Sequence, residues 1–255
     1  MSASSPQAAT VALRIDGRQI TMPAGRTLLQ ACTALGIDLP TLCFVEGLSA
    51  VGACRLCLVN VAGQVRPQTA CTTVAVDGME VESSSANLDL WRRLAVELLF
   101  QEGNHVCAFC VANHHCELQA LAARLGIDHP RYPARRPLRS VDASHPRFLL
   151  DHNVCILCGR CVRGCTELEG AQVWELAERG GRTRLVAGLD QPWGSVAACT
   201  SCGKCLQLCP TGALAEKGLT SGEQKADPSF ASRLRPTGSE PAVALPAWGP
   251  LEDWR

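Results

Sequence analysis

Apolar and polar residues alternate along residues 11–22. The apolar positions are Val11, Leu13 and Ile15 before an Asp-Gly pair at 16–17, and Ile20 and Met22 after it. Successive side chains of a strand point to opposite faces, so this alternation indicates two half-buried strands, and Asp-Gly is a common two-residue hairpin turn. The pattern therefore predicts a β-hairpin.

A short helix is predicted directly after the hairpin. Leu28, Cys32 and Leu35 recur at helical spacing and form an apolar stripe. Thr27 can cap the start of this helix, and Gly36 can end it. Further apolar segments at 58–61 and 74–81 predict strands that complete a small mixed sheet around a long cysteine-bearing loop.

Helical periodicity dominates after residue 85. The first apolar stripe consists of Trp91, Leu94, Ala95 and Leu98, and the second of Leu118, Leu121, Ala122 and Leu125. Gly103 and Gly126 follow these stripes and can end the two helices. Residues 85–150 are therefore expected to form a small helical domain.

The remaining part of the chain contains an internal repeat and a tail. Residues 155–165 and 199–209 carry the same cysteine spacing, which indicates a duplicated unit within a domain at 151–217. Residues 218–255 are rich in Pro, Gly, Ser and charge without periodicity, which predicts a flexible or partner-draped tail.

Composition changes the picture mainly through the 16 cysteines among 255 residues of zero net formal charge. The N-terminus lacks the basic and apolar regions of a secretory signal, and the apolar stretch at 94–100 is interrupted by Glu97. We therefore expect a cytoplasmic protein without a membrane span, in which abundant thiols bind metal or do redox work. The balanced charge gives no support for nucleic-acid binding.

The most specific motif is the repeated run C-x2-C-x2-C-x3-C, whose second copy is followed by Pro210. This run is typical of domains that hold two 4Fe-4S clusters, in which the fourth cysteine of each run binds the other cluster. The predicted ligand sets are Cys155, Cys158, Cys161 and Cys209 for one cubane, and Cys199, Cys202, Cys205 and Cys165 for the other. Paired C-x2-C units also form zinc sites, but zinc does not require triplets, so iron-sulfur clusters are favoured.

A second set has the spacing C-x10-C-x2-C-x13-C and consists of Cys43, Cys54, Cys57 and Cys71. Its first gap is longer than in plant-type ferredoxins, but one long loop can still enclose a 2Fe-2S cluster. Gly52 and Ala53 would let backbone amides approach the sulfurs. Four unrelated buried thiols are the alternative. The unassigned cysteine, Cys32, lies on an apolar helix stripe and is expected to be a buried free thiol.

The third set, Cys107, Cys110 and Cys116, lacks a fourth cysteine, so a 4Fe-4S cluster there needs another ligand. The nearby histidines are His105, His114 and His115. His105 is favoured because it follows the end of a predicted helix, where packing can fix its ring. No dinucleotide fingerprint, P-loop, nucleophile elbow or zinc-hydrolase motif is present, so no catalytic residue and no FMN or NAD site is expected on this chain.

This order of sets resembles the N-terminal part of the large iron-sulfur subunit of complex I and of iron-only hydrogenases. The segments EGNHVCAFCVANHHCELQ, DHNVCILCGRCVRGC and GLDQPWGSVAACTSCGKCLQLCPTGAL are similar to the small diaphorase subunits of soluble NAD-reducing bidirectional nickel-iron hydrogenases. The resemblance runs from about Val11 to Lys217. In complex I the histidine precedes the first cysteine by four positions, where this chain has Gly103, whereas His105 matches the diaphorase arrangement.

The resemblance implies an α+β chain with three domains and a tail. These are a β-grasp 2Fe-2S ferredoxin domain at 1–84, a helical histidine-ligated 4Fe-4S domain at 85–150, a bacterial-type two-cluster 4Fe-4S ferredoxin domain at 151–217 and the tail at 218–255. It also implies an electron-transfer subunit in a hetero-oligomer, between an FMN/NAD-binding diaphorase subunit and nickel-iron hydrogenase subunits. In this interpretation, the 2Fe-2S domain is a branch or reservoir, and the histidine-ligated cluster and the two cubanes form the main path.

Two other functions stay open from the sequence. The same electron-transfer role is compatible with an NAD-linked formate dehydrogenase or an electron-bifurcating complex, which co-purifying proteins would reveal. A zinc-binding structural interaction protein is the alternative of another class, and it predicts a colourless preparation.

Overall fold

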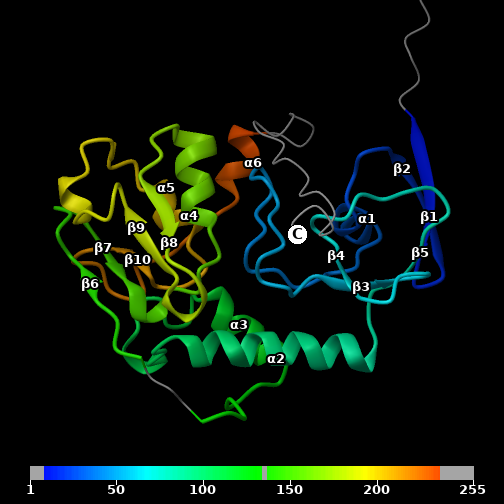
Figure 1. Cartoon of the computed structure of the whole chain (residues 1–255), viewed down its shortest axis with the longest axis horizontal. Coiled ribbons are helices and arrows are strands. Elements are labelled where there is room, and N and C mark those ends of the chain that lie inside the picture. Colours follow the sequence, from blue (N-terminus) through cyan, green and yellow to red (C-terminus); the bar gives the residue numbers. More distant parts are fainter. Residues whose placement is uncertain (1–8, 134–136, 236–255) are drawn as a thin grey trace, which may run out of the picture.

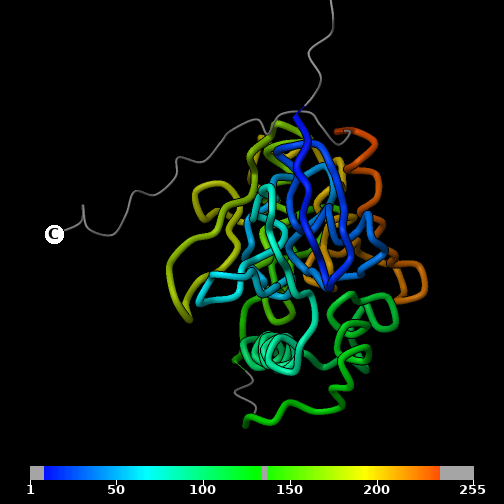
Figure 2. Tube along the Cα trace, turned by 90° about the vertical axis from the view of Figure 1, so that its right-hand side faces the viewer, coloured from blue at the N-terminus to red at the C-terminus, as the bar shows by residue number. Residues whose placement is uncertain are grey.

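The computed structural model describes residues 9–133 and 137–235. Figure 1 shows two lobes, one built from the N-terminal strands and the other from the strands and helices after residue 140, with two helices, α2 and α3, running beneath them. Figure 2, turned by 90°, shows α2 end-on below the strands of both lobes. The helical segment therefore underlies both parts that carry the other predicted sites.

The N-terminal lobe contains a five-stranded sheet in the order β2-β1-β5-β3-β4. Its strands are β1 (Thr10–Ile15), β2 (Arg18–Pro23), β3 (Leu58–Val61), β4 (Gln68–Thr69) and β5 (Glu80–Glu82). The predicted hairpin is confirmed: β1 and β2 are antiparallel, with Leu13 opposite Ile20. Asp16 and Gly17 form its turn with φ values of 50° and 76°, the left-handed conformation that a two-residue hairpin turn requires.

The predicted first helix is also confirmed as α1 (Leu28–Ala34). Thr27 caps it, because its side chain accepts from the Gln30 amide while the Gln30 side chain accepts from the Thr27 amide. The predicted strand at 58–61 is β3, but the prediction at 74–81 is wrong for most of its length. A turn with Gly78 at φ 75° interrupts that segment, so that only its last residues pair in the sheet.

The helical segment comprises α2 (Ala86–Glu102), a short turn η1 (Cys107–Phe109) and α3 (Glu117–Arg124). Both predicted helices are confirmed, but the predicted core face of α2 is wrong, because Trp91 and Leu98 are exposed. The buried face instead includes Arg92, whose guanidinium donates to the carbonyls of Leu56, Leu58 and Ser83. Because these hydrogen bonds satisfy its guanidinium, Arg92 can face the core, and the buried face of α2 therefore differs from the one that the apolar residues alone indicate.

The second lobe contains two small sheets and three helical segments. One sheet has the order β10-β7-β6 and the other pairs β8 with β9. The bounds are β6 (Val141–Asp142), β7 (Phe148–Asp151), β8 (Trp174–Ala177), β9 (Arg184–Ala187), β10 (Leu214–Glu216), α4 (Arg160–Arg163), the π-helical turn η3 (Gly164–Glu169) and α5 (Lys204–Leu208). Short 3-10 turns are η2 (His152–Val154), η4 (Gly180–Arg182) and η5 (Trp193–Ser195).

The internal repeat is visible in the backbone of this lobe. Leu157 and Gly159 have positive φ, and so do Ser201 and Gly203 at the equivalent positions of the second copy. Gly159 and Gly203 directly precede α4 and α5. Each copy therefore makes the same tight loop around its first three cysteines and then starts a helix.

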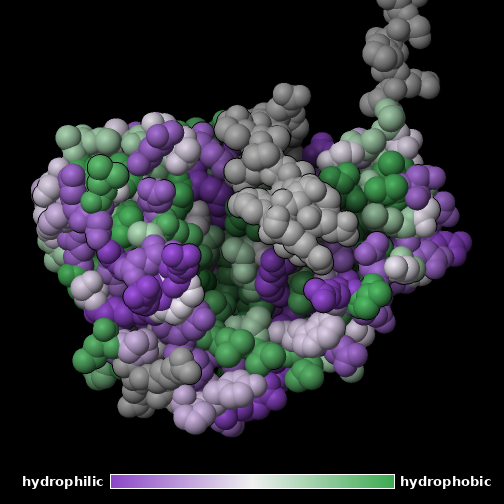
Figure 3. All heavy atoms as spheres, viewed as in Figure 1, coloured by the Kyte–Doolittle hydropathy of each residue, from purple (hydrophilic) through white to green (hydrophobic). Residues whose placement is uncertain are grey.

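The tail is predicted to be flexible or partner-draped, and flexibility is wrong for residues 230–234, which form α6 (Phe230–Leu234). Ala231 is fully buried with Val45, Leu48 and Leu208, so this helix packs where the two lobes meet. The end of the predicted tail, 236–255, lies outside the described residues. Within the part that the structure describes, no helix combines the length and apolar composition needed to cross a membrane. In Figure 3, hydrophobic residues gather in the hollow between the lobes.

Candidate iron-sulfur cluster sites

The four cysteines predicted to hold a 2Fe-2S cluster lie together in the N-terminal lobe. Cys43, Cys57 and Cys71 are each about 1% exposed. The Cys43 sulfur hydrogen-bonds with Cys54 and Cys71, which lowers the pKa of the Cys43 thiol. The same contacts raise the pKa values of Cys54 and Cys71. Cys57 in turn hydrogen-bonds with Cys71, so the four sulfurs form one connected group.

Backbone amides approach these sulfurs closely, as expected from the small residues beside Cys54. The amides of Ala53 and Cys54 hydrogen-bond to Cys43, and the Leu42 amide donates to Cys54 Sγ at 3.4 Å. Gly52 has φ 60°, and a Cβ there would lie 3.2 Å from Thr69 Oγ1. The loop therefore depends on glycine at this position to fold tightly around the sulfurs.

The third set shares one small cavity, lined by His105, Cys107, Cys110 and Cys116. His105 Nε2 is buried and finds no hydrogen-bond partner within the described residues. An unpartnered buried nitrogen is costly, so it indicates a bond to a group that the protein chain itself does not provide.

The His105 ring is held in one orientation by its neighbours. A hydrogen bond with the Leu99 backbone supports the ring, and Phe100 contacts it edge-on with 5.2 Å between ring centroids. Because Nε2 has no partner, this bond uses Nδ1 and leaves Nε2 free. Burial lowers the pKa of His105 and favours the neutral imidazole, the form that binds metal. His114 and His115 are exposed and do not line this cavity.

The two cubane sets occupy separate cavities in the second lobe. One cavity is lined by Cys155, Cys158, Cys161 and Cys209, and the other by Cys165, Cys199, Cys202 and Cys205. The structure thus places the fourth cysteine of each run with the first three of the other run. In the first set, burial raises the pKa values of Cys155 to about 11 and of Cys158 to about 12. Neutral thiols are therefore favoured there unless positive charge, such as iron, is bound.

The second cubane set receives hydrogen bonds that sequence spacing did not indicate. Trp193 Nε1 donates to Cys199 Sγ at 3.3 Å, and the Val173 amide donates to Cys165 Sγ at the same distance. Donors of this kind stabilise negative charge on sulfur and tune reduction potential. Cys202 is exposed, so this set reaches the protein surface.

The residues present fit iron-sulfur clusters. Thiolate sets, in one case completed by an imidazole, are the donors that such clusters take. Among the described residues, none of the sets is drawn together tightly enough to hold a single metal ion. Cys32 belongs to none of the sets; it is fully buried in the core of the N-terminal lobe, and burial raises its pKa to about 11.

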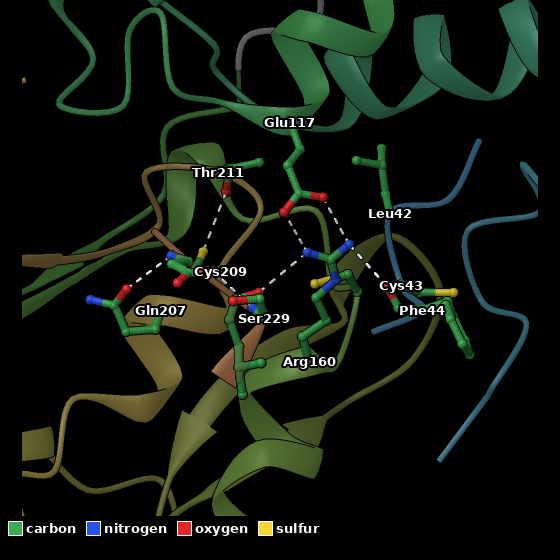
Figure 4. Close-up of polar contacts among 12 residues, drawn as sticks. Leu42, Cys43, Phe44, Glu117, Arg160, Gln207, Cys209, Thr211 and Ser229 are labelled. Atoms are coloured by element: carbon green, nitrogen blue, oxygen red, sulfur yellow. Dashed lines mark hydrogen bonds and ion pairs between the residues drawn. The ribbon is translucent and has the colours of Figure 1, made fainter. Parts of the chain in front are cut away.

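Arg160, the first residue of α4, joins three parts of the chain (Figure 4). Its guanidinium makes two bonds to the Glu117 carboxylate, at 2.6 and 2.8 Å. It also donates to the carbonyls of Phe44 at 3.1 Å and Leu208 at 3.5 Å. Each partner is the chain neighbour of a predicted ligand, namely Cys116, Cys43 and Cys209. The 2Fe-2S, histidine and first cubane sites therefore meet around one ion pair, in which Arg160 is buried and Glu117 is partly exposed.

Three family models match successive parts of the chain. They are a 2Fe-2S iron-sulfur cluster binding domain at 8–86, an NADH-ubiquinone oxidoreductase-G iron-sulfur binding region at 92–131 and a 4Fe-4S dicluster domain at 154–213. The gamma subunit of NAD-reducing hydrogenase HoxS from Cupriavidus necator is 32% identical over 82% of this chain and 88% of that protein. The chain belongs to the HoxS gamma subunit family.

Other relatives support the same modular organisation. The crystal structure of an NAD+-reducing [NiFe]-hydrogenase in the H2-reduced state contains a chain that is 37% identical, with a TM-score of 0.78, over 83% of this chain and 89% of that one. The NADPH-Fe(3+) oxidoreductase subunit alpha of Geobacter sulfurreducens is 37% identical over 81% of this chain. The chain spans only 24% of that longer relative.

Proposed function

We propose that this HoxS gamma family member is an iron-sulfur electron-transfer subunit. It would carry electrons between an FMN/NAD-binding diaphorase partner and a nickel-iron hydrogenase module in the cytoplasm. One observation carries this proposal: the predicted ligands fall into separate converging sets, and three of these sets meet around Arg160. When bound, the clusters supply one-electron oxidation and reduction.

The proposed cofactors are one 2Fe-2S cluster and three 4Fe-4S clusters. The 2Fe-2S ligands are Cys43, Cys54, Cys57 and Cys71, and the cubane sets are those lining the two cavities of the second lobe. For the third cubane we propose His105 with Cys107, Cys110 and Cys116. The unpartnered Nε2 supports His105 over the exposed His114 and His115.

The protein's own contribution is to hold these ligands and to exclude water. Burial of the sulfurs raises the energetic cost of adding charge, whereas amide and indole donors lower it. Both effects act through residues of this chain, such as Leu42 and Trp193. FMN and NAD are assigned to the diaphorase partner, and hydride and hydrogen would react on the partners.

The ligand proposal can be tested with EPR spectra of the reduced, anaerobically purified complex. We expect His105→Ala to alter one 4Fe-4S signal and to leave the 2Fe-2S signal unchanged, because these sites lie in different parts of the chain. His114→Ala is the matched control and should leave every signal unchanged, since that side chain is exposed. Changes in the control alone would move the ligand assignment to His114.

The partner is tested separately by identifying the proteins that co-purify with the tagged chain. Recovery of FMN-binding and nickel-iron hydrogenase subunits is the expected result. Recovery of a formate dehydrogenase or an electron-bifurcating enzyme would keep the electron-transfer role but replace the hydrogenase module.

A further inference from the structure

A second arginine, Arg163, lies between two of the proposed cluster sites. Its Nη2 atom donates to the Cys43 carbonyl at 2.6 Å and to the Cys158 carbonyl at 3.2 Å. Cys43 belongs to the 2Fe-2S set and Cys158 to the first cubane set. One nitrogen therefore links the backbones of ligands from two different sites, although Cys43 and Arg163 are 120 residues apart in sequence.

The remaining bonds of Arg163 also go to backbone carbonyls. Nη1 donates to the Ser49 carbonyl, and Nε donates to the Gly159 carbonyl at 3.2 Å. The residue is only 8% exposed. Its geometry is thus fixed by neutral acceptors on both sides of the contact between the lobes.

The charge of Arg163 is not paired directly with a carboxylate. Within the described ranges 9–133 and 137–235, no carboxylate lies within ion-pair distance of its guanidinium; Glu117 pairs with Arg160, and Glu167 pairs with Arg235 at 2.7 Å. Burying a cation without a counter-charge costs several kcal/mol.

Bound clusters would provide the missing negative charge. A cluster held by four thiolates is a net anion, and reduction adds one further negative charge. A fixed cation beside two such clusters stabilises the reduced form of each more than the oxidised form, because the Coulomb energy grows with the charge. Arg160 stabilises a reduced cluster less, because its two bonds to Glu117 make a pair with no net charge.

We propose that Arg163 is the cation shared by the 2Fe-2S site and the neighbouring cubane site, and that its charge raises the reduction potentials of both clusters. This inference rests on the proposed function. It makes Arg163 a positioning residue, because it acts through the ligands and touches no substrate. The shared cation also couples the 2Fe-2S site electrostatically to the neighbouring cubane site.

The test is a redox titration of the complex followed by EPR, comparing Arg163→Gln with Arg163→Lys. We expect Arg163→Gln to weaken reduction of both clusters about tenfold, equivalent to about 59 mV for one electron. Arg163→Lys keeps the charge and should hold both potentials near wild type. Arg14→Gln is the matched control, since it removes a charge from the exposed face of the same lobe as the 2Fe-2S site.

Each contrary outcome has a distinct meaning. If wild type shows the iron-sulfur signals and Arg163→Gln leaves both reduction potentials unchanged, the proposed role of Arg163 is overturned and the proposed function stands. Equal shifts in the Gln and Lys variants, or loss of the 2Fe-2S cluster in both, would also overturn it by showing that geometry matters and charge does not. Absence of iron-sulfur signals from wild type would overturn the proposed function together with this inference.

Discussion

Gly103 offers the sharpest perturbation of the histidine site. An added Cβ at this position would lie 2.5 Å from His105 Nε2 and 2.7 Å from the Asn153 carbonyl oxygen, whereas ordinary contacts begin at 3.4 Å. Gly103 has φ −114°, which any residue can adopt. The substitution Gly103→Ala therefore introduces a steric clash without backbone strain.

The clash can be relieved in two ways, and their costs decide the outcome. Moving the Asn153 carbonyl would disturb its hydrogen bond from the Asn104 amide, which is 2.7 Å long. Rotating the His105 side chain off its preferred conformation costs only about 0.5–1.5 kcal/mol. The ring should therefore move further than the backbone, and overpacking should cost about 1–3 kcal/mol in total.

We expect Gly103→Ala to displace Nε2 from its cavity and so to change or abolish one 4Fe-4S EPR signal, with loss of up to about four iron atoms per chain. The other signals should persist. Gly181→Ala is the matched control, because nothing lies within 4 Å of a Cβ at that position. A Gly103→Ala protein with wild-type iron content and an unaltered spectrum would refute the placement of His105 at a cluster.

Three further variants test other contacts. Trp193→Phe removes the indole donor to Cys199 Sγ, so the potential of one 4Fe-4S cluster should fall in an EPR titration; an unchanged potential would contradict this role. Cys32→Ala should retain every EPR signal, and in wild type the Cys32 thiol, with its pKa raised to about 11 by burial, should resist iodoacetamide at pH 8. Glu117→Gln leaves the buried Arg160 cation without its carboxylate and should lower the free energy of urea unfolding by about 1.5 kcal/mol, less than for a fully buried pair because Glu117 is partly exposed to screening by water; a change below about 0.5 kcal/mol would contradict the importance of this pair.

Much of the fold and the candidate sites follows from local sequence patterns. The hairpin turn at Asp16-Gly17 and the cap at Thr27 each depend on residues only a few positions apart. The cysteine runs are similarly compact, so their loops could be recognised by spacing. Such patterns can be recognised in the sequence because the residues that interact are only a few positions apart.

Other features depend on distant partners and could not be predicted. Arg92 faces the core because carbonyls 9 to 36 residues away accept its hydrogen bonds. For this reason the core face of α2 was predicted wrongly from its apolar residues. Arg160 and Arg163 form bonds to the Phe44 and Cys43 carbonyls, 116 and 120 residues away. Their only sequence signal is the presence of cations between closely spaced cysteines.

Metal analysis of the anaerobically purified protein shows whether this chain holds iron-sulfur clusters. We expect about fourteen iron and fourteen sulfide per chain, the content of one 2Fe-2S and three 4Fe-4S clusters. A colourless protein that contains zinc with negligible iron and sulfide would contradict it.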